Sequence, residues 1–227
     1  MSVRIARRGA IAAARASAPA ANVAYLSLPG TSGNYASTPD SAAVSAGTFD
    51  MRVRLSLPNW SGTYSFASKY GAAGQISWRF RTFVKFLASV RSADGTATTS
   101  NNAGGQMSVS DGNIRWVRMT FDSGFLQFMT STDGTNWNVE YASSVGGSIF
   151  DSTAPLVVGA GNLDGTVEPI AANIYYAELR NGVGGTVVAK FDPTTVTKTA
   201  TRTPNTVTAS TGEIWTVNGS GWDWVLV

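Results

Sequence analysis

The sequence contains neither cysteine nor histidine among its 227 residues. Without cysteine there is no disulfide framework and no thiolate zinc site. Without histidine the usual general base near neutral pH is missing. The two absences exclude nucleophile–base pairs that use either residue, so any catalysis would depend on carboxylates, lysine or tyrosine.

Charged residues are scarce at 14%, and no run of about eighteen apolar residues exists that would predict a membrane span. Hydrophobic residues make up 43%, which is enough for a substantial core. The 24 glycines, with many threonines, serines and asparagines, favour short strands and frequent turns over long helices. We therefore expect an all-β chain with one large domain.

The positive charge is concentrated at the N-terminus. The net charge is +3, and four arginines lie within the first fifteen residues, so the rest is close to neutral: Arg4, Arg7, Arg8 and Arg15. Residues 2–18 are rich in alanine and arginine and end before Pro19, which predicts a helix. We expect residues 1–21 to be a basic helical arm that docks on an acidic or grooved partner surface. Arginines without interleaved aromatic residues do not indicate a nucleic-acid partner.

From residue 22 onward the pattern is that of strands. Residues 51–57 alternate strictly, with Met51, Val53 and Leu55 predicted to point inward. Residues 75–80 and 114–121 repeat the pattern, and the adjacent Trp116 and Val117 predict a bulge. Further strands are expected at 125–129, 175–180, 187–191, 214–217 and 222–227. Residues 194–210 fit either an edge strand with long loops or a strand on a partner surface.

Regular turn signals separate these strands. Aspartate or asparagine precedes glycine at several places where a tight hairpin needs a positive φ angle, among them residues 94–95, 111–112, 133–134, 164–165 and 181–182. We find no repeat of fixed period and no second domain boundary. Residues 22–227 are therefore predicted to form a two-sheet antiparallel sandwich.

Several segments resemble laminin G-like domains of the concanavalin A-like lectin and glucanase superfamily, most closely versions encoded by tailed bacteriophages. The segments occur in order at 25–30, 34–40, 48–53, 68–71 with Trp78, 131–134 with Trp137, 174–182 and 185–189. The resemblance covers roughly residues 23–192. It implies a concanavalin A-like jelly-roll sandwich whose rim loops often bind sugar or calcium. One such sandwich hosts many functions, so the resemblance is a poor guide to the ligand.

Carboxylates are too sparse for the glucanase chemistry of that superfamily. The chain has four glutamates, and none has a second carboxylate two or four positions away along a strand. Glu178 lies on a convincing strand, where we expect it to partner an arginine. We therefore expect no enzyme activity.

Sugar binding needs exposed aromatic rings with polar groups beside them. Trp60 and Trp137 fall at predicted turns, although Trp137 also fits a packing role, whereas Trp78 and Trp116 lie inside strands and are predicted to be core. The candidate glycan contacts are Trp60, Asn101, Asn102, Trp137 and Asp164. Loop oxygens at Asn101, Asn102, Asp122, Asp151, Asn162 and Asp164 could also hold calcium, but turn chemistry explains them, so we expect no cofactor or metal.

These observations predict a bacteriophage virion protein, either a minor tail protein or a capsid decoration protein, assembled in the host cytoplasm. It would be present in multiple copies or as a homo-oligomer. Arg4, Arg7, Arg8 and Arg15 would anchor it to other virion proteins, and the sandwich would decorate the particle and attach to host-surface glycan. The alternative is a free carbohydrate-binding module or lectin with a dispensable arm. A glycoside hydrolase would instead show two carboxylates facing each other at roughly 5–10 Å.

Overall fold

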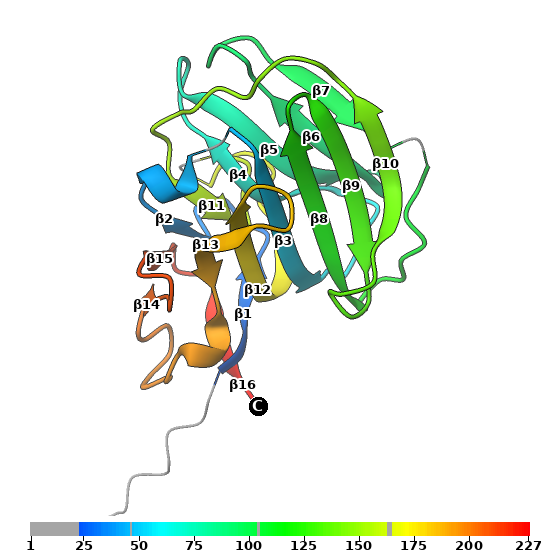
Figure 1. Ribbon diagram of the computed structural model, residues 1–227. Helices are drawn as coiled ribbons and strands as arrows, with labels where there is room; N and C mark the ends of the chain where they lie inside the picture. Colours follow the sequence, from blue (N-terminus) through cyan, green and yellow to red (C-terminus); the bar gives the residue numbers. More distant parts are fainter. Residues whose placement is uncertain (1–22, 46, 104, 163–164) are drawn as a thin grey trace, which may run out of the picture.

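The computed structural model describes residues 23–45, 47–103, 105–162 and 165–227 (Figure 1). The predicted helical arm with its four arginines lies outside the described residues, and so does Asp164. The described helices are two short 3-10 turns, η1 (Ala42–Val44) and η2 (Pro193–Thr195). In this part of the chain no helix is long and apolar enough to cross a membrane. The predicted all-β class is confirmed.

The first sheet has eight antiparallel strands. They are β1 (Val23–Pro29), β3 (Phe49–Ser56), β8 (Ile114–Asp122), β9 (Phe125–Ser131), β10 (Asn138–Ser144), β12 (Ala171–Asn181), β13 (Thr186–Phe191) and β16 (Asp223–Leu226). Their order is β10-β9-β8-β3-β12-β1-β16, and β13 pairs with the C-terminal half of β12. Some neighbours in this order, such as β12 with β1 and with β3, lie far apart in sequence, so the sheet places residues from distant segments side by side.

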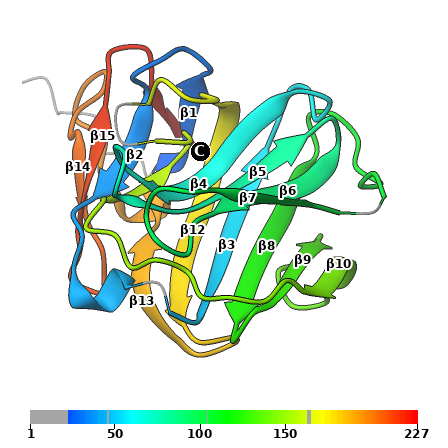
Figure 2. The same ribbon diagram turned by 90° about the horizontal axis from the view of Figure 1, so that it is seen from above.

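The second sheet also has eight strands and packs on the first. In sheet order they are β14 (Thr206–Thr208), β15 (Ile214–Asn218), β2 (Tyr35–Thr38), β11 (Leu156–Val158), β4 (Thr63–Tyr70), β5 (Ile76–Phe83), β6 (Phe86–Arg91) and β7 (Thr99–Asn102). Figure 2 shows the strands β4 to β7 facing β3, β8 and β9 across the interior. The predicted two-sheet antiparallel sandwich is confirmed.

The core lies between the two sheets and is rich in aromatic rings. Met51, Val53 and Leu55 are completely buried, as their alternation predicts. Phe80 from the second sheet stacks on Phe128 from the first, with ring centroids 5.9 Å apart. Trp78, predicted to be core, is buried and stacks on Phe49 at 4.9 Å. Such contacts between aromatic rings join the two sheets.

The prediction for Trp116 and Val117 is wrong. β8 keeps an unbroken register with β3 and with β9, so there is no bulge at this pair. Val117 is fully buried in the core, whereas Trp116 is only partly buried and lies on the opposite, outer face. The two apolar residues are adjacent because the outer face of this sheet also carries aromatic rings, including Tyr176 at 5.6 Å from Trp116.

The C-terminal strands complete both sheets. β16 extends the first sheet beside β1, and β15 extends the second beside β2. Residues 194–210 contribute β14, which is the edge strand of the second sheet, so the edge-strand alternative is the one the fold adopts. Trp215 and Trp224 pack against Phe191 at 5.3 and 6.3 Å and close this end of the core.

Candidate functional site

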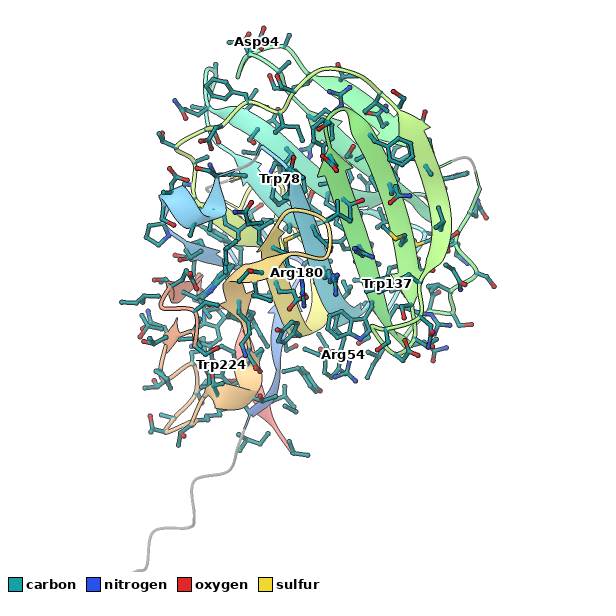
Figure 3. All side chains as sticks on the ribbon, in the orientation of Figure 1. Arg54, Trp78, Asp94, Trp137, Arg180 and Trp224 are labelled. Atoms are coloured by element: carbon teal, nitrogen blue, oxygen red, sulfur yellow. The ribbon has the colours of Figure 1, made fainter. Side chains whose placement is uncertain are left out.

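The outer face of the first sheet carries a dense group of polar side chains. Asp50 and Arg52 of β3 point to this face, because side chains alternate along a strand and the neighbouring Met51 and Val53 point into the core. Arg118 of β8 lies directly opposite Arg52 in the ladder. Figure 3 shows Arg180 and Trp137 over the same face.

Asp50 is the centre of this group. Its side chain is fully buried and accepts paired hydrogen bonds from two guanidinium groups: Arg52 at 3.0 and 2.7 Å, and Arg118 at 2.8 and 2.7 Å. The Gly184 N–H donates a further bond at 3.0 Å. Burial by itself would raise the pKa of Asp50, but the hydrogen bonds from Arg52 and Arg118 outweigh it and hold the pKa below its ordinary value. This carboxylate is saturated by the protein itself.

Glu178 of β12 extends the network. It accepts a hydrogen bond from Arg180 at 2.7 Å and another from the Tyr176 hydroxyl at 2.9 Å, and Arg52 lies 3.5 Å away. Burial, followed by the nearby carboxylate of Glu178, raises the pKa of Tyr176. The expected pairing of Glu178 with an arginine is therefore present. Glu178 is buried, however, with only 5% of the residue exposed.

Trp137 covers this network rather than standing free. Its ring is partly buried and lies 5.2 Å from the guanidinium carbon of Arg118 and 5.5 Å from that of Arg52. The Trp116 ring meets it edge-on at 6.5 Å. Cation–π contacts of this kind stabilise both partners. The contacts of Trp137 therefore fit the packing role rather than that of a free aromatic ring for a sugar.

The turn before Trp137 is built by its own side chains. The Ser131 hydroxyl accepts hydrogen bonds from the N–H groups of Asp133 and Gly134 at 3.2 and 2.9 Å. Asp133 accepts backbone hydrogen bonds at 2.8 Å from the N–H groups of Asn136 and Thr135, and these bonds lower its pKa well below the usual range. Gly134 has φ +77°, and a Cβ there would lie 2.8 Å from the Trp116 ring. Only glycine fits this position.

A second feature of the same face is a hollow of about 420 Å³. Its floor is formed by Ser27 of β1, Asn173 of β12 and Ser56 of β3, which stand in one row across the three strands. Pro29 and Pro58 contribute to its rim. Within the described chain, the three floor side chains make no hydrogen bond to the protein. They are therefore available to a ligand.

Tyrosine rings lie beside the hollow. Tyr25 and Tyr175 are two residues along their strands from Ser27 and Asn173, and their ring centroids are 5.0 Å apart. The Arg54 guanidinium lies 5.3 Å from the Tyr175 ring. A bulge in β12 between Ile174 and Tyr176 leaves both Tyr175 and Tyr176 partly exposed. The hollow thus combines uncommitted hydrogen-bonding groups with neighbouring aromatic rings.

The predicted glycan contacts are not brought together. Trp60 is completely buried, which corrects its expected exposure. Its backbone N–H is bound by Asp111 at 2.9 Å, and its ring packs 6.1 Å from Phe66, so the turn folds back into the core. Asn101 and Asn102 lie on β7, on opposite faces of the second sheet.

The floor residues of the hollow were missed by sequence reasoning. Small polar residues within strands carry no motif, and residues 27, 56 and 173 become neighbours only through the sheet order. The sequence did indicate, through alternation, that Ser27 and Asn173 point outward on the same strands as Tyr25 and Tyr175. Alternation identifies the face of a residue but not its neighbour on the next strand.

The described residues contain no group of three or more acidic side chains placed to hold a metal ion. Several of the loop candidates for calcium have protein partners. Asp122 accepts hydrogen bonds from Thr48 and Ser123, Asp151 is paired with Lys69, and Asn162 bonds to the loop that follows it.

Solved structures share this fold at low sequence identity. The first is a heptameric SAP-like pentraxin from Limulus polyphemus, with a TM-score of 0.59 and 11% identity over 92% of this chain and 97% of the pentraxin. A putative carbohydrate binding protein from Bacteroides ovatus has a TM-score of 0.59 and 12% identity over 90% of this chain and 60% of its own. Domains LG4-5 of the mouse laminin α1 chain have a TM-score of 0.53 and 12% identity over 82% of this chain and 50% of theirs.

No model of a known protein family matches the sequence, and no curated protein matches it significantly. At identities of 11 to 12% the structural likeness establishes the fold. The chain therefore has the concanavalin A-like sandwich fold found in pentraxins and laminin G-like domains.

Proposed function

We propose that this chain is a non-catalytic, glycan-binding sandwich and that the hollow on the first sheet holds the sugar. The observation that carries the proposal is the row of Ser27, Asn173 and Ser56, whose side chains have no partner among the described residues and line a hollow of about 420 Å³. That volume lies within the usual range for small-ligand sites. The description of the Bacteroides ovatus protein as a putative carbohydrate binding protein supports the same class of function.

The chemistry of the hollow suits a neutral sugar. Serine hydroxyls and an asparagine amide both donate and accept hydrogen bonds, as sugar hydroxyls do. The apolar face of a sugar ring can lie against the neighbouring Tyr175 ring, whose polar edge remains in water. The carboxylates on this face are bound by arginines, so the hollow offers recognition groups rather than a free acid–base pair.

A glycan array on the full chain, followed by titration calorimetry with the best glycan, tests this proposal. We expect Asn173→Ala and Tyr175→Ala each to weaken binding by about tenfold, the usual effect of losing one good contact. Asn102→Ala removes an exposed asparagine from the other sheet and serves as the matched control, expected to leave affinity unchanged. If only Asn102→Ala weakened binding, the site would lie on the second sheet and our placement would be wrong.

We propose further that the sandwich is displayed on a bacteriophage particle, as a minor tail or capsid decoration protein, and anchored there by its basic arm. The supporting observation is the clustering of Arg4, Arg7, Arg8 and Arg15 ahead of a nearly neutral domain. Many copies on one particle would convert weak glycan contacts into strong attachment.

Deletion of residues 2–18 tests the anchoring role. We expect the truncated chain to keep its fold and its glycan affinity but to be lost from purified particles. Unchanged incorporation would contradict the anchoring role. A protein that is found free and binds glycan as a monomer would favour the alternative of an independent carbohydrate-binding module.

A further inference from the structure

A separate pocket of about 200 Å³ lies at the open end of the sandwich, where β8 begins and β9 turns into β10. Its lining includes Arg115, Thr130, Asn136, Asn138 and Glu140. No aromatic ring lines it, unlike the surroundings of the hollow. The pocket is small and strongly polar, which distinguishes its chemistry from that of the first site.

Strand register explains why these side chains converge. Arg115 lies opposite the buried Leu55, and Thr130 lies opposite the buried Val117, so both are on the inner face of the first sheet. They stand where the hydrophobic core ends. Asn138 lies opposite Thr130 and therefore shares that face.

A bulge in β10 adds the acidic group. The register shifts between Val139 and Tyr141, so Tyr141 takes the position opposite Phe128 and packs on its ring at 5.4 Å. Glu140 is the extra residue of the bulge and accepts a hydrogen bond from the Thr130 hydroxyl at 2.6 Å. Bulges often redirect a side chain in this way next to binding sites.

Arg115 has an unusual status among the arginines of the described chain. It is partly buried, yet its guanidinium makes no hydrogen bond, ion pair or ring contact with any described residue. The only other described arginine without such contacts, Arg202, is exposed to solvent. Arg52 and Arg118 each bind a carboxylate through two bonds. A partly buried cation without a counter-charge favours binding of an anion.

We propose that this pocket binds a single carboxylated sugar residue and is a second binding site, separate from the hollow. The ligand carboxylate pairs with the planar guanidinium of Arg115 through two parallel hydrogen bonds. A hydroxyl at the other end of the ring donates to Glu140, whose second carboxylate oxygen has no partner among the described residues, and Asn138 contributes an amide. This inference deepens the proposed glycan-binding function by naming an acidic sugar class and a separate site.

Titration calorimetry of the full chain with glucuronate, glucose and acetate tests the inference. We expect glucuronate to bind at least about tenfold more tightly than either of the other probes, because glucose lacks the carboxylate and acetate lacks the ring hydroxyls. Arg115→Gln should weaken glucuronate binding by about tenfold or more, and Arg115→Lys should fall between, since lysine lacks the planar fork. Arg202→Gln is the matched control and should not change the affinity.

Equal affinities for glucose and glucuronate would overturn the inference, and so would equal affinities for acetate and glucuronate. An unchanged affinity in Arg115→Gln would also overturn it, provided that thermal unfolding shows the variant to be folded. The hollow variants Asn173→Ala and Tyr175→Ala separate this inference from the proposed function. They should leave glucuronate binding unchanged while weakening binding of the neutral glycan, and loss of glucuronate binding in these variants alone would place the acidic sugar in the hollow instead.

Discussion

The outer face of the first sheet holds two polar regions of opposite character. Around Asp50, each charged group has partners: two guanidiniums bind one carboxylate, Arg180 and Tyr176 bind the next, and Trp137 covers the arginines. Toward the other ends of β3 and β12, and on the neighbouring β1, the serines and asparagine of the hollow have no side-chain partner within the described chain. Both regions are built from strand residues with outward alternation, so position on the sheet does not distinguish them.

The comparison distinguishes polar groups that stabilise the fold from polar groups that remain available to a ligand. Polar groups that satisfy one another in a buried network hold the fold together, and they have no bonding capacity left for a ligand. Groups that remain unsatisfied beside a hollow contribute little to the fold and are ready to bind. On this view, the Asp50 network stabilises the fold, and the hollow is the site that we propose for ligand binding.

The largest expected effect follows from breaking the network. Asp50→Ala would leave Arg52 and Arg118 partly buried without their shared counter-charge and would orphan the Gly184 N–H. Removal of one partner from a buried charge network typically costs about 3–5 kcal/mol, and we expect a loss in unfolding free energy of that order by urea denaturation. Asp122→Ala, at an exposed aspartate, is the control and should change stability by less than about 0.5 kcal/mol. A similar small loss for both variants would show that the network is not structural.

The same network predicts an acid-sensitive stability. The pKa of Asp50 is lower in the folded protein than in the unfolded chain, so its ionised form stabilises the fold at pH values above about 3.8, the ordinary value. That contribution is lost as the pH falls through the folded value. Unfolding free energies measured from pH 7 to pH 2 should therefore show a difference between the native chain and Asp50→Asn that shrinks in acid. A constant difference would mean that the ionisation of Asp50 does not stabilise the fold.

Local patterns in the sequence were sufficient to predict the sandwich. The alternation of residues 51–57 identified the buried face of β3, and glycines 95, 112, 134, 165 and 182 all adopt the positive φ angles that hairpins were expected to need. Each of these features depends on the few residues beside it. The all-β sandwich followed from them without knowledge of the strand order, whereas the jelly-roll class was implied by the resemblance to laminin G-like domains.

The candidate sites depended on information that local patterns lack. Trp60 follows Pro58 and Asn59 and resembles an exposed loop tryptophan. In the structure its backbone N–H donates a hydrogen bond to the distant Asp111, and its ring is buried in the core. The alternation around Trp116 defines two faces of the strand but does not show which face the second sheet covers, so the prediction that Trp116 lies in the core is wrong. The hollow requires the register of three strands that are 29 and 117 residues apart in the chain, which only the assembled sheet provides.

The smallest expected effect sharpens the comparison through two buried serines. Ser65 is fully buried and donates a hydrogen bond of 2.7 Å to Glu168, whereas Ser56, only 5% exposed, has no side-chain partner among the described residues. Ser65→Ala should cost about 1.5–3 kcal/mol, because it removes a hydrogen bond to a charged group. Ser56→Ala removes a hydroxyl that bonds to nothing in the described chain, so the unfolding free energy should stay within about 0.5 kcal/mol of the native value or rise slightly. Urea denaturation measures both, and titration with the bound glycan should then show weaker binding for Ser56→Ala alone. A stability loss at Ser56 equal to that at Ser65 would mean that the hollow, like the network, serves the fold.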